Sequence, residues 1–411
     1  MRHTDVVIAG GGLAGSLAAA MLGRAGTDAV LIDPHPAYPS DFRCEKLDGT
    51  QMRTLALTGL SEAVIRASTA DIEFWEARFG RVVDKRPGDQ RGILYDTLVN
   101  TVRSEIPERT AVVHAKVVAI STGPERQTVQ LSNGEEISAR LVILATGLNP
   151  GVREKLGIER NIISAGHSIS IGFDVKPLDR TAFPFSSLTY FADKPTDRMA
   201  YITLFPIGDT MRANLFGYRD LHDPWLKQLR DAPQATLYAM WPRLRRLMGD
   251  FAVTDFIKIR PVDLYVTKGY LQDGIVLVGD AFSTSCPAAG TGARKVLVDV
   301  ERLCNVHVPA WLATPGMNAA KIASFYDDPV KRDCDTRSAA KAFQLRSFSI
   351  DPAWSWTAMR WAKFAVQAIR GVLHRLRAKQ KPPVGPFGNA PAAENPSLAR
   401  SELAQTTPGR E

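Results

Sequence analysis

The chain has 411 residues, 45% hydrophobic and 23% charged, which is typical of a globular protein and long enough for at least two lobes. It has no run of about 18 uncharged apolar residues and no secretory signal, which argues against a membrane span and export and predicts a cytoplasmic protein. The net charge of +8 comes partly from a basic stretch at residues 351–381, and because no nucleic-acid-binding motif accompanies it, we expect no nucleic-acid partner.

The chain opens with a strand, a glycine-rich turn and a helix. The apolar run Asp5-Val6-Val7-Ile8-Ala9 predicts a buried strand, and Gly10-Gly11-Gly12-Leu13-Ala14-Gly15 follows it directly. A small-residue helix is expected from Ser16 to Arg24. A second apolar run, residues 29–32, then ends at Asp33. This order of elements predicts a parallel sheet.

The turn carries the pattern Gly-x-Gly-x-x-Gly, formed by Gly10, Gly12 and Gly15. Glycines at these places let the backbone approach a pyrophosphate, and the N-terminus of the following helix, at Leu13 and Ala14, offers unpaired N–H groups to it. Asp33 lies about 20 residues further on, where a carboxylate accepts hydrogen bonds from ribose hydroxyls. We therefore expect these residues to bind the adenosine half of a dinucleotide.

Further elements are predicted along the rest of the chain. Apolar runs at 111–118, 141–145 and 274–278 fit more strands of the same sheet, so the first domain is discontinuous. Between them, four strand-like runs separated by turn signals predict an antiparallel sheet. These runs are residues 167–175, 187–191, 200–205 and 212–218. Helices are expected at 223–248, 319–347 and 354–380.

A second motif lies near residue 280. The run 274–278 ends at Gly279-Asp280, and Pro287, Gly290, Gly292 and Ala293 follow. With the N-terminal motif, this pattern resembles the group A FAD-dependent monooxygenases, the para-hydroxybenzoate hydroxylase type. The resemblance implies that Asp280, after Gly279, holds the ribityl chain of FAD and that the segment from Pro287 to Ala293 passes beside the flavin ring. The start of the helix near Thr291 would then stabilise negative charge on the reduced flavin.

Three smaller matches accompany this resemblance. Arg91 is expected to open a helix towards Val102. The resemblance implies that it contacts the FAD phosphates, and the alternative is a solvated arginine at a helix start. Arg43 implies another FAD contact, the alternative being a surface charge cluster. Asp299 falls where the family usually carries an acid.

The middle motif of the family departs from its pattern. Gly147, Val152 and Arg153 match, but Thr146 replaces an aspartate that the family ties to FAD and nicotinamide nucleotide handling. We therefore predict slow direct reduction by NADPH unless substrate or a partner reductase is present. Arg294 stands beside the expected flavin position where many relatives have asparagine.

Other reactive side chains carry weaker signals. The four cysteines, Cys44, Cys286, Cys304 and Cys334, lie far apart without a C-x-x-C pair, so we expect free thiols and no metal site. His167 and His222 are candidate proton carriers or packed histidines. Tyr201, Thr203 and Phe205 alternate onto one face of a predicted strand, which suits either a pocket roof or ordinary sheet packing.

Together these features predict an α/β fold: a Rossmann-type FAD-binding domain with an inserted antiparallel-sheet substrate domain and C-terminal helices. The FAD-binding domain comprises residues 1–165 and 263–345, and the substrate domain comprises 166–262. Residues 346–380 are a C-terminal amphipathic helix, and the proline-rich, apolar-poor segment 381–411 is predicted to be a disordered tail.

The resemblance implies an FAD-dependent oxidoreductase that takes electrons from NADPH or NADH. As a monooxygenase, it would insert one oxygen atom from O2, through a flavin hydroperoxide, into a small aromatic or lipophilic substrate. Two alternatives stay open, a flavin-dependent lipid or isoprenoid C=C reductase of the geranylgeranyl reductase type and a non-catalytic flavin-binding partner subunit. The sequence identifies no catalytic residue and no particular substrate.

The helix expected at 354–377 suggests a peripheral contact. Trp354, Trp361 and Ile369 gather on one helical face, and Arg360 and Lys363 are expected on the opposite face. Val372 and Leu376 continue the apolar face, with Leu373 at its margin and Arg370 on the basic side. Such a helix could lie at the interface of an anionic membrane, at its cytoplasmic side, or pack over the FAD-binding domain.

Overall fold

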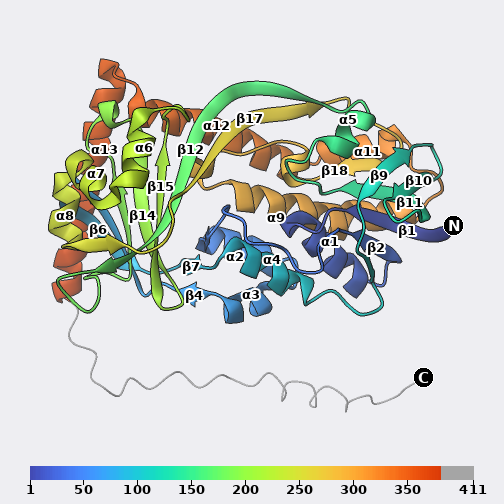
Figure 1. Cartoon of the computed structure of the whole chain (residues 1–411), viewed down its shortest axis with the longest axis horizontal. Coiled ribbons are helices and arrows are strands. Elements are labelled where there is room, and N and C mark those ends of the chain that lie inside the picture. The colour runs from blue at the N-terminus through green and yellow to red at the C-terminus, as the bar shows by residue number, and fades with distance from the viewer. Residues whose placement is uncertain (381–411) are drawn as a thin grey trace, which may run out of the picture.

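In the computed structural model, which describes residues 1–380, the N-terminal strand β1 (Arg2–Ala9) lies inside a seven-stranded first sheet (Figure 1). β1 pairs in parallel with β2 (Ala29–Ile32) and β11 (Glu136–Leu144), and all four residues of β2 are buried. Burial on both faces explains why these strands are continuous apolar runs. The remaining strands of this sheet are β8 (Ala111–Val113), β9 (Val117–Ser121), β10 (Gln127–Leu131) and β18 (Ile275–Leu277).

One predicted strand of this sheet is in fact two. The interval 111–118 is divided between β8, which pairs in parallel with β2, and β9, which pairs antiparallel with β10. The late strand β18 pairs in parallel with β11, so the discontinuous sheet expected from the sequence is present.

Helices pack against the first sheet and form one core with it. The small residues of α1 (Leu13–Arg24) are buried from Leu13 to Gly23, which lets this helix lie close to the strands. The other helices of this lobe are α2 (Gly49–Ala56), α3 (Ser61–Ala67), α4 (Tyr95–Arg103), α5 (Gly151–Lys155), α9 (Gly292–Arg302), α10 (Val308–Leu312) and α11 (Ala319–Tyr326).

A small third sheet corrects the prediction for Arg91. β7 (Arg91–Gly92) pairs with β3 (Lys46–Leu47) and β4 (Thr69–Ala70), and α4 begins only at Tyr95. Arg91 does not open a helix because its backbone is committed to these two strands and Leu94, the N-cap, is still extended.

The second sheet forms the other lobe. Its longest strand, β12 (Glu159–Pro177), pairs with β17 (Lys258–Lys268) along a ribbon that arches from α5 to the second sheet (Figure 1). Most pairs are antiparallel, but β5 and β13 are parallel. The other strands are β5 (Glu73–Arg78), β6 (Arg81–Pro87), β13 (Ser187–Phe191), β14 (Met199–Ile207), β15 (Thr210–Gly217) and β16 (Phe251–Val253).

The second sheet therefore extends beyond the interval 166–262. It takes β5 and β6 from the N-terminal part of the chain, and β12 already begins at Glu159. The division of the chain into an FAD-binding domain at 1–165 and 263–345 and a substrate domain at 166–262 stays a prediction.

Alternation along the strands of this sheet separates two faces. Ile202 and Leu204 of β14 belong to a core with the helices that cover the outer face, while Tyr201, Thr203 and Phe205 point the other way. The predicted helix 223–248 is divided into three because Pro224, Pro233 and Pro242 each begin a helix. These are α6 (Pro224–Asp231), α7 (Pro233–Met240) and α8 (Pro242–Met248).

Two further helices close the described part of the chain. Pro329 likewise divides the predicted helix 319–347 and begins α12 (Pro329–Ile350). α13 (Trp354–Gln380) packs against β6 and α12 rather than over the first sheet. Arg360, predicted on the face opposite the apolar residues, is 6% exposed, and its guanidinium donates to the carbonyls of Phe348 and Asp351, so it is not available to a membrane surface. The predicted tail 381–411 and the side chains of residues 371–380 lie outside the described part.

Candidate functional site

The glycine turn between β1 and α1 combines tight packing with an open side. A Cβ atom on Gly15 would lie 1.8 Å from the carbonyl oxygen of Gly10, so only glycine lets helix and turn approach this closely. Gly10 itself has a φ of 103°. A Cβ on Gly12 would instead meet only the ring of Tyr38, at 3.9 Å, and no side chain caps α1. The open side at Gly12 and the uncapped helix fit a pyrophosphate, and Leu13 and Ala14 lie in that first turn.

Asp33 lies beside this turn at the end of β2. Its carboxylate accepts from the Gly11 amide at 2.7 Å and from the His35 amide at 3.0 Å, and it pairs with Arg103 at 2.9 Å. Arg103, at the end of α4, also donates to the carbonyl of Gly11. The carboxylate is thus fixed next to the glycine turn, as an adenosine site requires. Arg103 was missed from the sequence, since a basic residue in the last turn of a helix is common.

The second motif brings two distant predictions together. β18 leads into Gly279, which has a φ of 58°, and then into Asp280. The Arg43 guanidinium lies 3.0 Å from the Asp280 carboxylate and 2.6 Å from that of Asp41. Burial and these anionic neighbours act on Arg43 in opposite directions, and its pKa is raised overall. Arg43 and Asp280 therefore form one charged edge, although they are far apart in the chain.

The segment from Pro287 to Gly292 also leaves open space. Pro287 begins a short 3-10 turn, and Gly290 follows with a φ of 65°, where a Cβ atom would meet nothing within 4 Å. At Gly292, which begins α9, the nearest atom to a Cβ would be 3.8 Å away. Gln51 donates to the Gly290 carbonyl at 2.9 Å. A backbone without side chains on one side, next to the N-terminus of α9 and Ala293, fits the approach of a flat ring.

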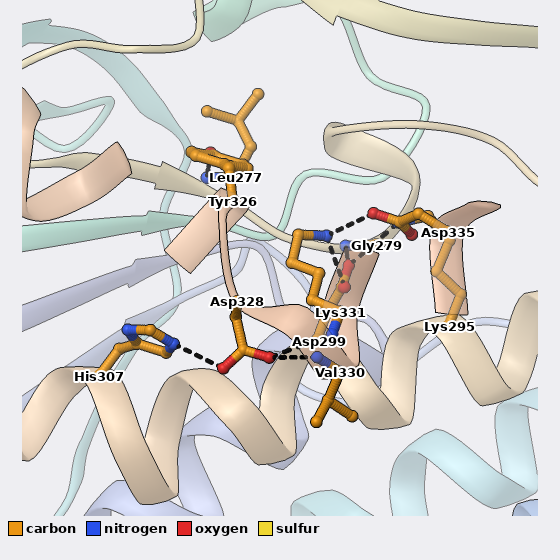
Figure 2. A network of polar contacts seen from close by, with 10 residues as sticks. All are labelled: Leu277, Gly279, Lys295, Asp299, His307, Tyr326, Asp328, Val330, Lys331 and Asp335. Atoms are coloured by element: carbon orange, nitrogen blue, oxygen red, sulfur yellow. Dashed lines mark hydrogen bonds and ion pairs between the residues drawn. The ribbon is translucent and has the colours of Figure 1, made fainter. Parts of the chain in front are cut away.

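A buried charge network supports the turn at Gly279 (Figure 2). One Asp299 oxygen accepts from the Gly279 amide at 2.9 Å, and the other accepts from Lys331 at 2.7 Å. Lys295 and Asp335 complete the network, with Lys295 bonded to both carboxylates. Burial opposes ionisation of Asp299, but the two lysines outweigh it and lower its pKa. The network holds the amide of Gly279 and so positions Asp280.

Arg153 of the middle motif also contacts the turn that follows β18. Arg153, 1% exposed, donates to the carbonyl of Ala281 at 2.8 Å. Tyr265 donates to the carbonyl of Asp280 at 2.6 Å. Gly147 has a φ of 58° and open space around it, whereas the Thr146 hydroxyl donates to the nearby carbonyl of Asn149 at 3.5 Å. Arg153 therefore supports the Gly279–Asp280 turn.

Several predicted residues lie apart from this centre. The Arg91 guanidinium donates to Ser68 and to the carbonyl of Ile65, and its contact with FAD phosphates remains a prediction. Arg294 is exposed in the first turn of α9. Burial raises the pKa of the Cys286 thiol, which supports a packing role, and burial with the nearby Arg346 lowers the pKa of His167 to about 4.

The inner face of the second sheet covers the segment from Pro287 to Gly292, called the flavin segment below after its predicted role. Tyr201 donates to the carbonyl of Ala288 at 2.7 Å, and Lys46 donates to Thr203 at 2.9 Å. Beside them, Arg212 and Glu45 form a buried bidentate pair, each about 2% exposed in its side chain. Lys46, Glu45 and Arg212 were missed from the sequence, because no motif marks residues that meet only across two sheets.

Comparison with known proteins agrees with this geometry. The FAD binding domain family matches residues 3–306. The 3-demethoxyubiquinol 3-hydroxylase of Escherichia coli is 26% identical over 359 residues, covering 80% of this chain and 87% of the relative. A digeranylgeranylglycerophospholipid reductase of Thermoplasma acidophilum is 25% identical over 331 residues, covering 72% and 76%.

Solved structures show the same fold. The p-nitrophenol 4-monooxygenase PnpA of Pseudomonas putida superposes with a TM-score of 0.69 at 16% identity, covering 92% of this chain and 98% of that one. The family match spans most of the chain and contains both motifs described above. The chain therefore belongs to the FAD binding domain family, among the group A FAD-dependent monooxygenases, and is an FAD-dependent oxidoreductase.

Proposed function

We propose that this enzyme inserts one oxygen atom from O2 into a small aromatic or lipophilic substrate held between the second sheet and the flavin segment. The observation that carries the proposal is the contact between Tyr201 and the Ala288 carbonyl, which closes the inner sheet face over that segment. The 3-demethoxyubiquinol 3-hydroxylase to which the chain is similar supports the substrate class, and the p-nitrophenol 4-monooxygenase shares its fold.

Residues from three parts of this chain would hold FAD. The glycine turn and Asp33 would receive the adenosine and pyrophosphate, Asp280 the ribityl chain, and the segment from Pro287 to Gly292 the ring. Reduced FAD would activate O2 for the oxygen transfer. The inner sheet face would orient the substrate over the ring and exclude water.

Reoxidation of the reduced holoenzyme tests this function. We expect O2 to reoxidise the flavin and isotopically labelled oxygen from O2 to appear in a hydroxylated product from a panel of phenols and quinols. Anaerobic reoxidation by an unsaturated isoprenoid lipid would instead support the C=C reductase alternative. A flavin that reacts with O2 but yields no product from any compound would support the non-catalytic alternative.

The electron donor is proposed to be NADPH or NADH, either directly or through a partner flavin reductase. Thr146 cannot supply the carboxylate of the family motif, so we expect slow reduction of the bound flavin by NADPH without substrate or partner. Stopped-flow reduction measures this. Fast bleaching by NADPH or NADH alone would contradict the expectation and make a partner reductase unnecessary.

A peripheral contact of α13 with the cytoplasmic face of a membrane is also proposed. None of the helices in residues 1–380 is long and apolar enough to cross a bilayer. On α13, however, Trp354 is 83% exposed, Trp361 56% and Ile369 60%, and exposed basic residues Lys363 and Arg370 lie nearby on the helix. A helix with an exposed apolar face and basic residues on the other side suits the interface of an anionic lipid surface.

Vesicle sedimentation tests the membrane contact. We expect the full chain to sediment with vesicles containing phosphatidylserine at low salt, and a Trp354→Ser, Ile369→Ser double variant to sediment less. Because both side chains are exposed, the double variant should keep its FAD and its unfolding temperature. Equal sedimentation of the two proteins would contradict the proposal.

A further inference from the structure

Half-buried Lys46 differs from the buried lysines Lys295 and Lys331 in having no carboxylate of the described residues at ion-pair distance. Its ammonium donates to Thr203 at 2.9 Å and lies 5.3 Å from the ring of Phe205. Within residues 1–380, no carboxylate oxygen lies at ion-pair distance from it. By contrast, Lys295 and Lys331 each pair with two aspartates. A cation with no carboxylate at ion-pair distance is a candidate for binding an anionic ligand.

Lys46 also lies on the wall that faces the flavin segment. Thr203, its partner, is on the same face of β14 as Tyr201, which contacts Ala288. In the chain, Lys46 lies between Arg43, which contacts Asp280, and Gln51, which contacts Gly290. Both neighbours along the chain therefore contact the predicted flavin site, and the side chain between them points to the covering sheet.

The surroundings of Lys46 disfavour its charged form. Burial of the ammonium lowers its pKa to about 8. Asp71, before β5, and Asp48 and Cys44, on its own segment, oppose this effect, whereas Arg86 on β6 adds to it. An amine with such a pKa can both accept and return a proton near neutral pH.

We propose that Lys46 is a catalytic residue: its amine takes the proton from an ionisable hydroxyl group of an aromatic substrate and then holds the oxyanion. The inference rests on the proposed function and narrows its substrate class to phenols, quinols and enols. The O–H bond of the substrate breaks, an N–H bond forms at Nζ, and the electron pair stays on oxygen. The resulting oxyanion enriches the ring in electrons, which favours attack on an electrophilic oxygen atom.

Thr203 and Thr189 can support this transfer. Thr203 accepts from Lys46, and its hydroxyl oxygen lies 3.3 Å from that of Thr189. A hydroxyl in this position can turn its hydrogen towards the oxyanion when Lys46 donates to it. Thr189, Thr203 and Lys46 thus offer a small polar patch within the inner face of the sheet.

Binding of 4-nitrophenol to the holoenzyme tests the proposal without turnover. Its phenolate is coloured and its phenol form is not, so a difference spectrum against the holoenzyme reports which form is bound. At a pH below the pKa of the free probe, we expect the wild-type protein to bind the phenolate. Lys46→Met should bind it about 10- to 100-fold more weakly, as expected when a charge-assisted hydrogen bond is lost, or bind the phenol form. Lys46→Arg, which keeps a cation, should still bind phenolate.

Matched controls make each outcome decisive. Lys227→Met removes an exposed lysine on α6 and should bind the probe like wild type, and FAD content and unfolding temperature verify that each variant folds. Phenolate binding by Lys46→Met at wild-type strength would overturn the proposal, as would a wild-type protein that binds only the phenol form or no probe. Labelled oxygen in a product together with unchanged binding by Lys46→Met would reject Lys46 and leave the proposed function intact. Phenolate binding that depends on Lys46, without any oxygenated product, would support the contact between Lys46 and the oxyanion and reject the proposed oxygen transfer.

Discussion

The two ends of the predicted FAD site are held in different ways. At the predicted adenosine end, α1 and the turn approach so closely that a Cβ on Gly15 would lie 1.8 Å from the Gly10 carbonyl oxygen, and one pair, Asp33–Arg103, braces them. At the flavin end, the turn at Gly279 rests on Asp299 and Lys331, each 1% exposed. One end depends on backbone contact within a short segment, and the other depends on buried charges from distant segments.

The largest expected effect on stability is at the flavin end. Asp299→Asn leaves Lys331 and Lys295 with Asp335 alone, whose side chain is 26% exposed. Because uncompensated buried charge is costly, the free energy of unfolding should fall by about 3–5 kcal/mol, measured by urea denaturation at pH 7. Asp333→Asn on the same helix as Lys331 breaks only an exposed pair with Arg337 and serves as the control, with a change within about 0.5 kcal/mol. Equal midpoints for the two variants would remove the contrast between the ends.

Two glycine substitutions sharpen the description of the adenosine end. Gly15→Ala forces the turn and helix apart and should lower the free energy of unfolding by about 1–3 kcal/mol.

Gly12→Val enters open space and should change stability little, but its side chain would occupy the predicted pyrophosphate position. We expect this variant to fold and to bind FAD at least about a hundredfold more weakly. Unchanged FAD affinity in Gly12→Val would show that the assignment of this turn is wrong.

Acid should lower the free energy of unfolding by protonating Asp328 at the start of α12. Asp328, the N-cap of this helix, pairs with Arg302 and His307, and although burial opposes ionisation, these partners and the helix amides lower its pKa from 3.8 to about 2. Because the folded pKa is the lower one, the stabilisation is complete above pH 4 and is lost as pH falls towards 2. Asp328→Asn keeps a good N-cap residue and should cost about 2 kcal/mol at pH 7. Unfolding curves of the two proteins should converge near pH 2, and a constant difference across this range would contradict the assignment.

The smallest effect on stability is expected from Asp280→Ala. This carboxylate is near the surface of the site, with 31% of its side chain exposed, and its pair with Arg43 is partly solvated. The unfolding free energy should change by less than about 1 kcal/mol, whereas FAD binding should weaken because the predicted contact with the ribityl chain would be lost. Fluorescence titration with FAD measures the affinity. Retention of wild-type affinity would reject the role predicted for Asp280.

The same contrast explains what the sequence could predict. The glycine turn, Asp33 and the Gly279–Asp280 turn were visible because each is encoded within a few consecutive residues. Strand runs were also visible, since burial of both faces requires continuous apolar residues. The alternation of Tyr201, Thr203 and Phe205 indicated the inner sheet face but not its partners.

The partners of these segments were not predictable from one sequence. In the sequence, Arg103 and Lys331 look like ordinary helix residues. They pair with Asp33 and Asp299 only because tertiary packing brings α4 and α12 next to these carboxylates. Likewise, β5 and β6 read as part of the N-terminal domain, because the pairing of β5 with β13 is set by tertiary packing rather than by local propensity. The contact of Lys46 with Thr203 could not be predicted either, because it forms only where the small third sheet packs against β14.

The late position of β18 in the first sheet has a consequence for how this protein is made. β18 pairs with β11, yet every strand from β12 to β17 is synthesised between them. Until Leu277 has left the ribosome, the edge of β11 next to β18 stays unpaired, and the Gly279 turn does not exist. Long-range pairing of this kind is slow, since the intervening loop must close first. The second sheet is therefore complete in sequence, and free to fold, before the nascent chain can form a cofactor site.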